Sequence, residues 1–147
     1  MKVSFVIPGP PKGKGRPRFS NAGPYVSTYT PQDTKNYEEL VRMVYMAQCR
    51  NYKFSDNAQL DIRIFAYFPI PKSTTKQRAR EMEAQILRPA IKSDWDNIGK
   101  IICDACNGIA YHDDKQIVDA QVRKFYSHKP RVQVIIQDAQ PITGPVE

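Results

Sequence analysis

The sequence of 147 residues is poor in the features that anchor or cross-link a protein: it has three cysteines, two histidines and no long apolar run. No apolar stretch approaches the roughly 20 residues that a transmembrane helix needs, so we expect a chain that does not enter a membrane. The short apolar run after Lys2 soon reaches proline and glycine, and therefore does not resemble a secretory signal. We expect a cytoplasmic protein, and we find no internal repeat.

The three cysteines, Cys49, Cys103 and Cys106, cannot all pair within one chain, which excludes a disulfide scaffold. The spacing of Cys103 and Cys106 is compatible with a zinc or redox motif, but a structural zinc site needs a second ligand pair of suitable spacing, and the sequence has none. Two small buried residues one helical turn apart explain the spacing better. A redox function would require an accessible thiol with a low pKa.

The composition is that of one ordinary globular domain. Hydrophobic residues make up 41% and charged residues 25% of the chain, which is long enough for a core of its own, so we assign residues 1–147 to a single domain. The formal net charge of +7 attracts polyanions, and nucleic acid is the commonest polyanionic partner of such a domain.

The order of the elements indicates the fold class. Strands are predicted over Lys2–Ile7, Ala58–Phe68, Gln116–Tyr126 and Arg131–Gln137, with a short extended piece over Tyr25–Tyr29. Three helices are predicted. The first runs from Pro31, with Thr30 as its cap, to about Cys49; the second begins after Ser73 or Thr74; the third covers Asp96–Asn107. This mixture predicts an α+β (mixed α/β) domain with a single small mixed sheet and helices packed on it. We expect the last two strands to be antiparallel across a hairpin or meander turn at residues 127–130, and a frayed tail over residues 141–147.

Basic residues gather in two places. The first is a Pro- and Gly-rich loop over residues 9–23, in which the cations alternate with glycine and proline, so that the backbone can approach a phosphate closely. The second is the exposed helix after Ser73. The candidate DNA-binding residues are Lys12, Lys14, Arg16, Arg18, Lys72 and Lys76, with Arg78 and Arg80 beside them. Such contacts would supply affinity without sequence information. A flexible, solvated arm is the alternative interpretation of the loop.

Acidic residues gather between Asp94 and Asp119. Six carboxylates and two lysines give these residues a net charge of −4. Because the whole chain has a net charge of +7, the remaining residues carry +11. Ser93 and the first acidic pair, Asp94 and Asp96, precede a helix, where capping and the helix dipole would explain them without any function.

The spacing of the remaining acids favours a function. Asp96 and Lys100 are four residues apart on one helix face, and Asp104 continues that row. A second pair, Asp113 and Asp114, comes before a strand, and it returns toward the first pair if that strand packs on the helix. Converging carboxylates cost energy unless a cation neutralises them, and oxygen ligands select hard cations such as Mg²⁺, with Mn²⁺ as a substitute. Metal beside a basic surface suits phosphodiester chemistry.

Lys100 has two interpretations at this stage. It can form a surface ion pair with Asp96 or Asp104. With a metal present, its ammonium can instead stabilise the pentacovalent phosphate or protonate the leaving 3′ oxygen.

Two stretches together resemble a known family. The sequence SDWDNIGKIICDACNGIAYHDDKQI, residues 93–117, is similar to the signature of the RusA-like Holliday junction resolvases, and PGPPKGKGRPRF resembles the basic loop of that family. The resemblance implies that Asp94, Asp96 and Asp114 bind Mg²⁺ and that Lys100 is the catalytic lysine. It makes Asp113 a supporting metal ligand and Asp104 a secondary candidate for metal support or positioning. The departures from the pattern, at Ser93, Ile98, Gly99 and Cys106, concern packing and helix entry.

The resemblance also implies an activity and partners. These are a Mg²⁺-dependent, structure-selective endodeoxyribonuclease, a homodimer that cuts four-way (Holliday) junctions by paired symmetric nicks, and a family frequent in phages and prophages. A two-fold dimer would supply two equivalent sites for the two nicks. Other branched DNA, such as forks and flaps, is an alternative substrate, and a non-catalytic basic DNA-binding module is the alternative of another class.

Overall fold

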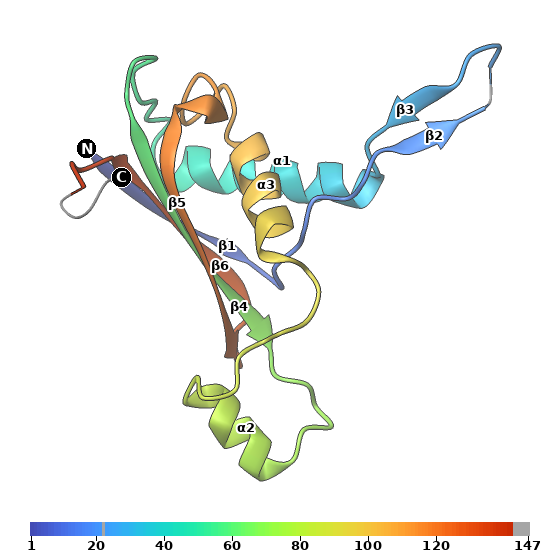
Figure 1. Cartoon of the computed structure of the whole chain (residues 1–147), viewed down its shortest axis with the longest axis vertical. Coiled ribbons are helices and arrows are strands. Elements are labelled where there is room, and N and C mark those ends of the chain that lie inside the picture. Colours follow the sequence, from blue (N-terminus) through green and yellow to red (C-terminus); the bar gives the residue numbers. More distant parts are fainter. Residues whose placement is uncertain (22, 143–147) are drawn as a thin grey trace.

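The computed structural model of the protein describes residues 1–21 and 23–142. A four-stranded mixed sheet in the order β1-β6-β4-β5 lies at its centre (Figure 1). The strands are β1 (Lys2–Pro8), β4 (Leu60–Pro69), β5 (Ile117–Ser127) and β6 (Arg131–Asp138). This confirms the predicted α+β class with one small mixed sheet. A separate two-stranded hairpin, β2 (Arg18–Ser20) with β3 (Ser27–Tyr29), stands away from the sheet.

The helices are α1 (Gln32–Gln48), α2 (Lys76–Glu83) and α3 (Trp95–Ala105), and a 3-10 turn, η1 (Asp114–Gln116), precedes β5. Helices α1 and α3 contact one another, α1 also contacts β1, and α3 contacts β5, whereas α2 lies at the far end of the molecule (Figure 1). The core lies between α1, α3 and the sheet. Alternate residues of β4 supply its centre, namely Leu60, Ile62, Ile64, Ala66 and Phe68, as the period of two in the sequence predicts.

The expected hairpin between the last two strands is wrong. Strand β5 pairs in parallel with β4, while β6 pairs with β4 in the antiparallel sense and with β1 on its other side. Strands β5 and β6 are therefore antiparallel in direction but separated by β4. Residues 128–130 cross the end of β4, where Pro69 and Ser127 are partners in the register. The short connection between β5 and β6 would allow them to pair with each other, but each strand pairs with β4 instead.

Several predicted boundaries shift by a few residues. Helix α1 begins after Pro31, which is its N-cap residue, so Thr30 is not the cap. Thr75 caps α2 by accepting a hydrogen bond from the backbone of Arg78, and Lys72 therefore precedes the helix. The loop predicted over residues 9–23 contains β2, which the sequence analysis missed. Residues 143–147 of the expected frayed tail lie outside the described residues.

Glutamine side chains close both outer strands of the sheet. The amide of Gln48 on α1 accepts a hydrogen bond from the backbone nitrogen of Val6 (2.9 Å) and donates one to its carbonyl (3.1 Å). Gln85, just after α2, makes the same pair of bonds with Tyr126 of β5, at 3.2 and 2.8 Å. These amides satisfy backbone groups that an edge strand leaves unpaired. They also join α1 and the α2–α3 connection to the sheet that carries the site.

No helix in the described part of the chain is long and apolar enough to cross a membrane.

Candidate active site

The first acidic pair lies at the N-terminus of α3. Asp94 is the N-cap residue and Asp96 belongs to the first turn, and both side chains are exposed. The carboxylate of Asp94 makes no side-chain capping hydrogen bond, and Ser93, which could have capped the helix, precedes the cap position. Both acids favourably oppose the helix dipole. Because capping does not occupy the oxygens of Asp94, they remain available to a ligand.

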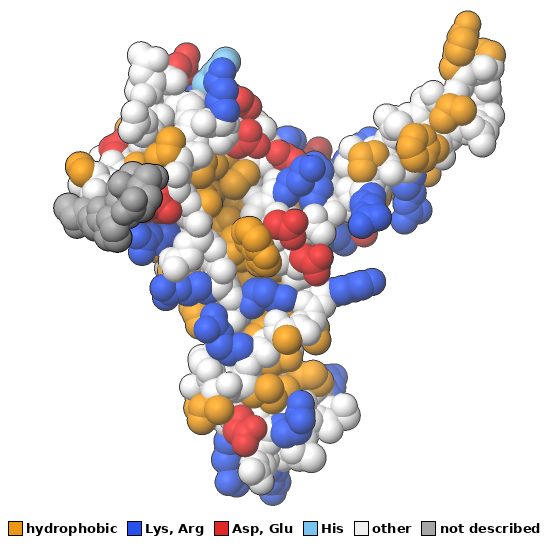
Figure 2. Space-filling model, in the orientation of Figure 1, with side chains coloured by type: hydrophobic (Ala, Val, Ile, Leu, Met, Phe, Trp, Pro, Cys, Tyr) orange, Lys and Arg blue, Asp and Glu red, His pale blue; other side chains and the backbone are white. Residues whose placement is uncertain are grey.

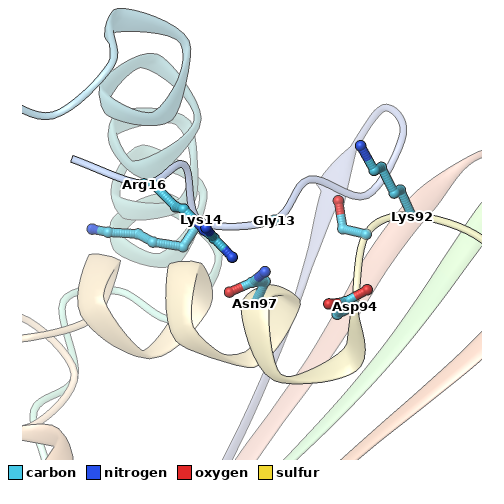
Figure 3. Close-up of a pocket in the computed structure, with 7 residues that line it drawn as sticks. Gly13, Lys14, Arg16, Lys92, Asp94 and Asn97 are labelled. Carbon is cyan, nitrogen blue, oxygen red and sulfur yellow. The ribbon is translucent and has the colours of Figure 1, made fainter. Parts of the chain in front are cut away.

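A pocket of about 320 Å³ opens beside this helix end. It lies between the basic loop and the start of α3 (Figure 3), and its lining consists of Gly13, Lys14, Arg16, Lys92, Ser93, Asp94 and Asn97. Three of these side chains are cationic and one is a carboxylate. The pocket thus brings the basic loop and the acidic motif, which are about 80 residues apart in sequence, to one place, in a combination that suits a phosphate oxygen and a cation.

The basic loop is held against α3 by its backbone. The nitrogen of Lys14 donates a hydrogen bond to the carbonyl of Asn97 (3.0 Å). A Cβ atom on Gly13 would lie 2.8 Å from the side chain of Ser93, closer than real Cβ atoms approach other atoms. Glycine is therefore required at residue 13 by this close approach, and it fixes the wall of the pocket.

Lys14 occupies the interior of the loop rather than its surface. Its ammonium contacts Glu38 on α1 at 3.1 Å and Asp104 on α3 at 3.3 Å. The side chains of Lys14 and Glu38 are only 20% and 10% exposed. One lysine therefore links the loop to both helices, and its charge is neutralised within the protein. Lys12 is paired as well, with Asp33 at 2.8 Å, in a more exposed position.

The second acidic pair meets the other end of α3. The backbone nitrogen of Asp114 donates a hydrogen bond to the side-chain oxygen of Asn107 (2.9 Å). Burial raises the pKa of the Asp114 carboxyl, and a hydrogen bond and charge repulsion from Asp104, with a smaller repulsion from Asp113, raise it further. Asp114 therefore lies beside Asp104. The inference that the strand after Asp114 packs on α3 is confirmed by the contacts between α3 and β5.

Gln116 of the motif holds the turn that carries this pair. Its side-chain oxygen accepts hydrogen bonds from the backbone nitrogens of His112 (3.0 Å) and Asp113 (3.2 Å). Its side-chain nitrogen donates to the carbonyls of Ser55 (2.9 Å) and Ala58 (3.2 Å), just before β4. Gln116 is 8% exposed, and both polar atoms of its side chain take part in these hydrogen bonds, which clamp the turn to the segment before β4. Its role in the motif is therefore positional.

The two acidic pairs are separated by the length of α3. Asp94 and Asp104 are ten residues apart on one helix, which is roughly 15 Å along the axis, and Asp114 lies beside Asp104. Among residues 1–21 and 23–142, no three His, Cys, Asp or Glu side chains are grouped closely enough to hold a metal ion by themselves. Mg²⁺ often uses only one or two carboxylates, together with water and substrate phosphates. Asp94 and Asp96 beside the cationic pocket fit a site of that kind.

The remaining predicted residues lie in different surroundings. Lys100 is exposed and has no ion-pair partner among the described residues, so the alternative of a pair with Asp96 or Asp104 is not formed. Arg16 and Arg18 are exposed on the loop and the hairpin. Figure 1 shows α2 apart from α1 and α3, and no residue of α2 lines the pocket. The cations Lys76, Arg78 and Arg80, with Lys72 before them, therefore belong to a separate basic surface.

Three site residues escaped the sequence analysis. Glu38 is an acid on the buried face of α1, and its position three residues before Val41 was the available signal. Lys92 lines the pocket, and Lys124 lies within electrostatic reach of Asp94 from β5. Burial lowers the pKa of Lys124, and the charge of Asp94 partly restores it. The sequence gives no signal for Lys124, because it is near Asp94 only through the tertiary fold. Lys92, by contrast, is two residues before Asp94, and this spacing was the available signal.

The cysteines have the properties of packed residues. Cys106 is fully buried and Cys103 is half-buried. Burial raises the pKa of Cys103 to about 12 and also raises that of Cys106. A redox function needs a thiol that ionises readily. These two thiols stay protonated at neutral pH.

Comparison with known proteins relates the whole arrangement to one family. Residues 8–137 match the family model described as endodeoxyribonuclease RusA. A protein of Bacillus subtilis (strain 168), named Uncharacterized protein YqaN, is 33% identical over 136 residues, which cover 92% of this chain and 96% of the relative. The matched residues include the basic loop, the pocket and both acidic pairs.

Proposed function

The chain belongs to the RusA endodeoxyribonuclease family, and on that premise we propose that it is a Mg²⁺-dependent, structure-selective endodeoxyribonuclease that resolves four-way DNA junctions by paired symmetric nicks. Membership implies a nuclease of the kind that resolves Holliday junctions, and therefore branched DNA as the partner. The requirement for Mg²⁺, the residues that act and the paired nicks are the proposed part.

The pocket at the N-terminus of α3 carries the proposal. It places Asp94, a carboxylate not used for capping, in one wall with Lys14, Arg16 and Lys92 around it. Arg16 and Lys92 can contact the two oxygens of a phosphate, while Lys14 keeps the loop in place through its ion pairs. A phosphodiester bound here would therefore lie beside a carboxylate and under cations, as hydrolysis requires.

Asp94 and Asp96 would hold the metal, together with phosphate oxygens of the DNA. Bound Mg²⁺, or Mn²⁺ in its place, supplies an activated water and stabilises charge on the phosphate. Asp114 and Asp113 lie at the other end of α3, roughly 15 Å from Asp94, and in this geometry do not reach an ion held by Asp94 and Asp96. The resemblance implies that they are ligands, whereas Asp114 lies beside Asp104, so Asp114→Asn must be assayed separately from the variants of the first pair.

Lys100 is the proposed catalytic lysine. It lies one turn after Asp96 on the same face of α3, and its exposed ammonium is not bound by an ion pair within residues 1–21 and 23–142. An ammonium free to reach the substrate can stabilise the charge that develops on the phosphate, or give a proton to the leaving 3′ oxygen. Lys100→Met would remove both contributions while leaving the buried side of the helix unchanged.

A homodimer completes the proposal. Two nicks in strands of like polarity require two equivalent sites, which a two-fold dimer provides. The basic surface of α2, with Lys72 and Lys76, is separate from the pocket and would bind phosphates of a second duplex arm of the junction.

The test is cleavage of a labelled four-way junction beside a linear duplex, a fork and a flap, in Mg²⁺, Mn²⁺ or EDTA. We expect paired symmetric nicks in the junction that require the metal. Asp94→Asn, Asp96→Asn and Lys100→Met should each lower the rate by at least about a hundredfold while binding is kept. The matched control is Asp56→Asn, which changes an exposed carboxylate in the turn before β4.

Other outcomes would select among the alternatives. Faster cleavage of forks or flaps than of junctions would move the substrate to other branched DNA. Binding without cleavage in either metal would refute the nuclease and leave a DNA-binding module. Cleavage that persists in Asp94→Asn and Asp96→Asn but is lost in Asp114→Asn would place the metal at the other end of α3.

A further inference from the structure

The β2–β3 hairpin, together with residues 23–26 at its tip, forms an arm that projects from the body of the protein (Figure 1). Its large hydrophobic side chains face solvent. Phe19 is 73%, Tyr25 83%, Val26 66% and Tyr29 47% exposed, and Figure 2 shows hydrophobic side chains along the whole arm. Single exposed apolar residues are ordinary, but four large ones gathered on one projecting element mark a binding surface.

The root of the arm is fixed to the body. The backbone nitrogen of Gly15 donates a hydrogen bond to the hydroxyl of Thr34 on α1 (3.1 Å). A Cβ atom on Gly15 would lie 2.5 Å from that hydroxyl oxygen and 3.2 Å from Pro31. The backbone at Gly15 therefore lies so close to the start of α1 that a larger side chain would not fit. The direction of the arm is set by this anchor rather than by the hairpin, which has only three residue pairs.

The charge of the arm indicates the chemistry of its partner. Residues 16–32, which include the arm and its root, contain Arg16 and Arg18 and no Asp or Glu. Arg16 and Arg18 lie at the root of the arm with no ion-pair partner among residues 1–21 and 23–142. Arg16 also lines the pocket that contains Asp94. A polyanion whose phosphate occupies the pocket would therefore continue along the arm.

The two faces of the hairpin carry different side chains. Arg18 is paired with Tyr29, and paired residues of an antiparallel ladder lie on the same face, so a cation and an aromatic ring are neighbours there. Phe19, paired with Thr28, lies on the opposite face. Rings beside cations bind nucleic acid at unstacked bases, because the ring stacks on the base while the cation holds the phosphate.

We propose that the arm binds the branch point of the DNA, where Phe19, Tyr25 and Tyr29 stack on base faces that a continuous duplex does not expose, while Arg16 and Arg18 hold the adjacent phosphates. The inference rests on the proposed function for the nature of the DNA. It adds the residues that distinguish a branched structure from a linear one. A second copy of the chain is a less suitable partner, because a surface with two cations and no acid does not complement itself.

The experiment measures binding in EDTA, so that cleavage is absent. The substrates are a four-way junction with 2-aminopurine beside the branch point and a linear duplex with closed ends. Phe19→Ala, Tyr25→Ala and Tyr29→Ala are compared with Ile86→Ala, a matched control that removes a residue 78% exposed near α2. We expect each arm variant to weaken junction binding about five- to a hundredfold, with little effect on the duplex. The fluorescence change of 2-aminopurine should shrink with it, and Tyr25→Phe should restore both.

Three results would overturn the inference. One is a wild-type protein that does not prefer the junction, and another is a set of arm variants that bind it as Ile86→Ala does. The third is an arm variant with lower mass than the wild type in sedimentation, since that would make a second copy the partner. The proposed function fails separately: arm-dependent binding without cleavage in Mg²⁺ refutes the nuclease alone, whereas Mg²⁺-dependent cleavage with arm-independent binding refutes the arm alone.

Discussion

Removal of Lys14 should destabilise the protein because its ammonium joins three elements. Lys14→Met leaves Glu38 and Asp104 without the cation that they share. Breaking a buried ion pair by removing one partner costs about 3–5 kcal/mol. Because Lys14 and Asp104 retain 20% and 26% exposure, solvent screens part of that charge. We therefore expect the free energy of unfolding to fall by about 2–3 kcal/mol, which is less than the cost of breaking a fully buried pair.

Urea unfolding at pH 7, followed by circular dichroism, measures this loss. A domain of this size should also melt roughly 5–10 °C lower. The control is Lys12→Met, because Lys12 makes an ion pair with Asp33 in the same loop but at the surface, where such pairs contribute little. The double variant Lys14→Met/Glu38→Gln should regain about half of the loss, since it removes one of the two unpaired charges.

The reasoning would be refuted by a Lys14→Met variant as stable as Lys12→Met. It would also be refuted if Glu38→Gln added its full cost on top of Lys14→Met, because independent costs would mean that the two side chains do not interact.

Three further predictions concern the motif. Gln116→Glu replaces an amide that donates to two carbonyls with a carboxylate that cannot, so the free energy of unfolding should fall by about 2–4 kcal/mol; thermal melting measures it, and an unchanged melting temperature would contradict the clamp. Because the pKa of Asp114 is raised in the folded state, its charge costs stability above that pKa and costs nothing below about 3.9, the unfolded value. Asp114→Asn should therefore melt higher than the wild type at pH 7 without metal, and the difference should disappear as the pH falls toward 3. Burial keeps the thiols of Cys103 and Cys106 protonated, so alkylation of the native protein at pH 8 should be much slower than in urea; equal rates, measured by mass spectrometry, would show that the thiols are accessible.

Local patterns in the sequence were sufficient for most elements. The alternation in β4 and the helical stripe of Ile98, Ile101 and Ile102 in α3 are periodic over their full lengths, so each could be assigned without knowledge of its neighbours. Helix ends were less certain because several residues near each end can cap, as Thr30 and Pro31 show for α1. The strand β2 was missed because three residues among glycines and prolines carry no periodic signal.

The order of the strands depended on contacts that sequence spacing does not reveal. Three residues join β5 to β6, which is short enough for a hairpin, yet both strands pair with β4 from the middle of the chain. In this arrangement the buried residues of β6, Val132, Val134 and Ile136, lie beside buried residues of β4 on one apolar face of the sheet. Lys14 shows the same limit for the site: its place in a basic loop indicated a phosphate contact, whereas its ammonium lies between two helices and pairs with Glu38 and Asp104.

The sequence by itself determined the fold class, the family resemblance and the residue types of the site, because these depend on local periodicity and on motifs read along the chain. The tertiary structure decided which of those residues meet. It brought the basic loop to Asp94, placed Asp114 against Asp104 at the other end of α3, and set the exposed arm next to the pocket. The reason is physical: a motif fixes the chemistry of each side chain, but distances between segments far apart in sequence follow from how the helices and the sheet bury their apolar faces.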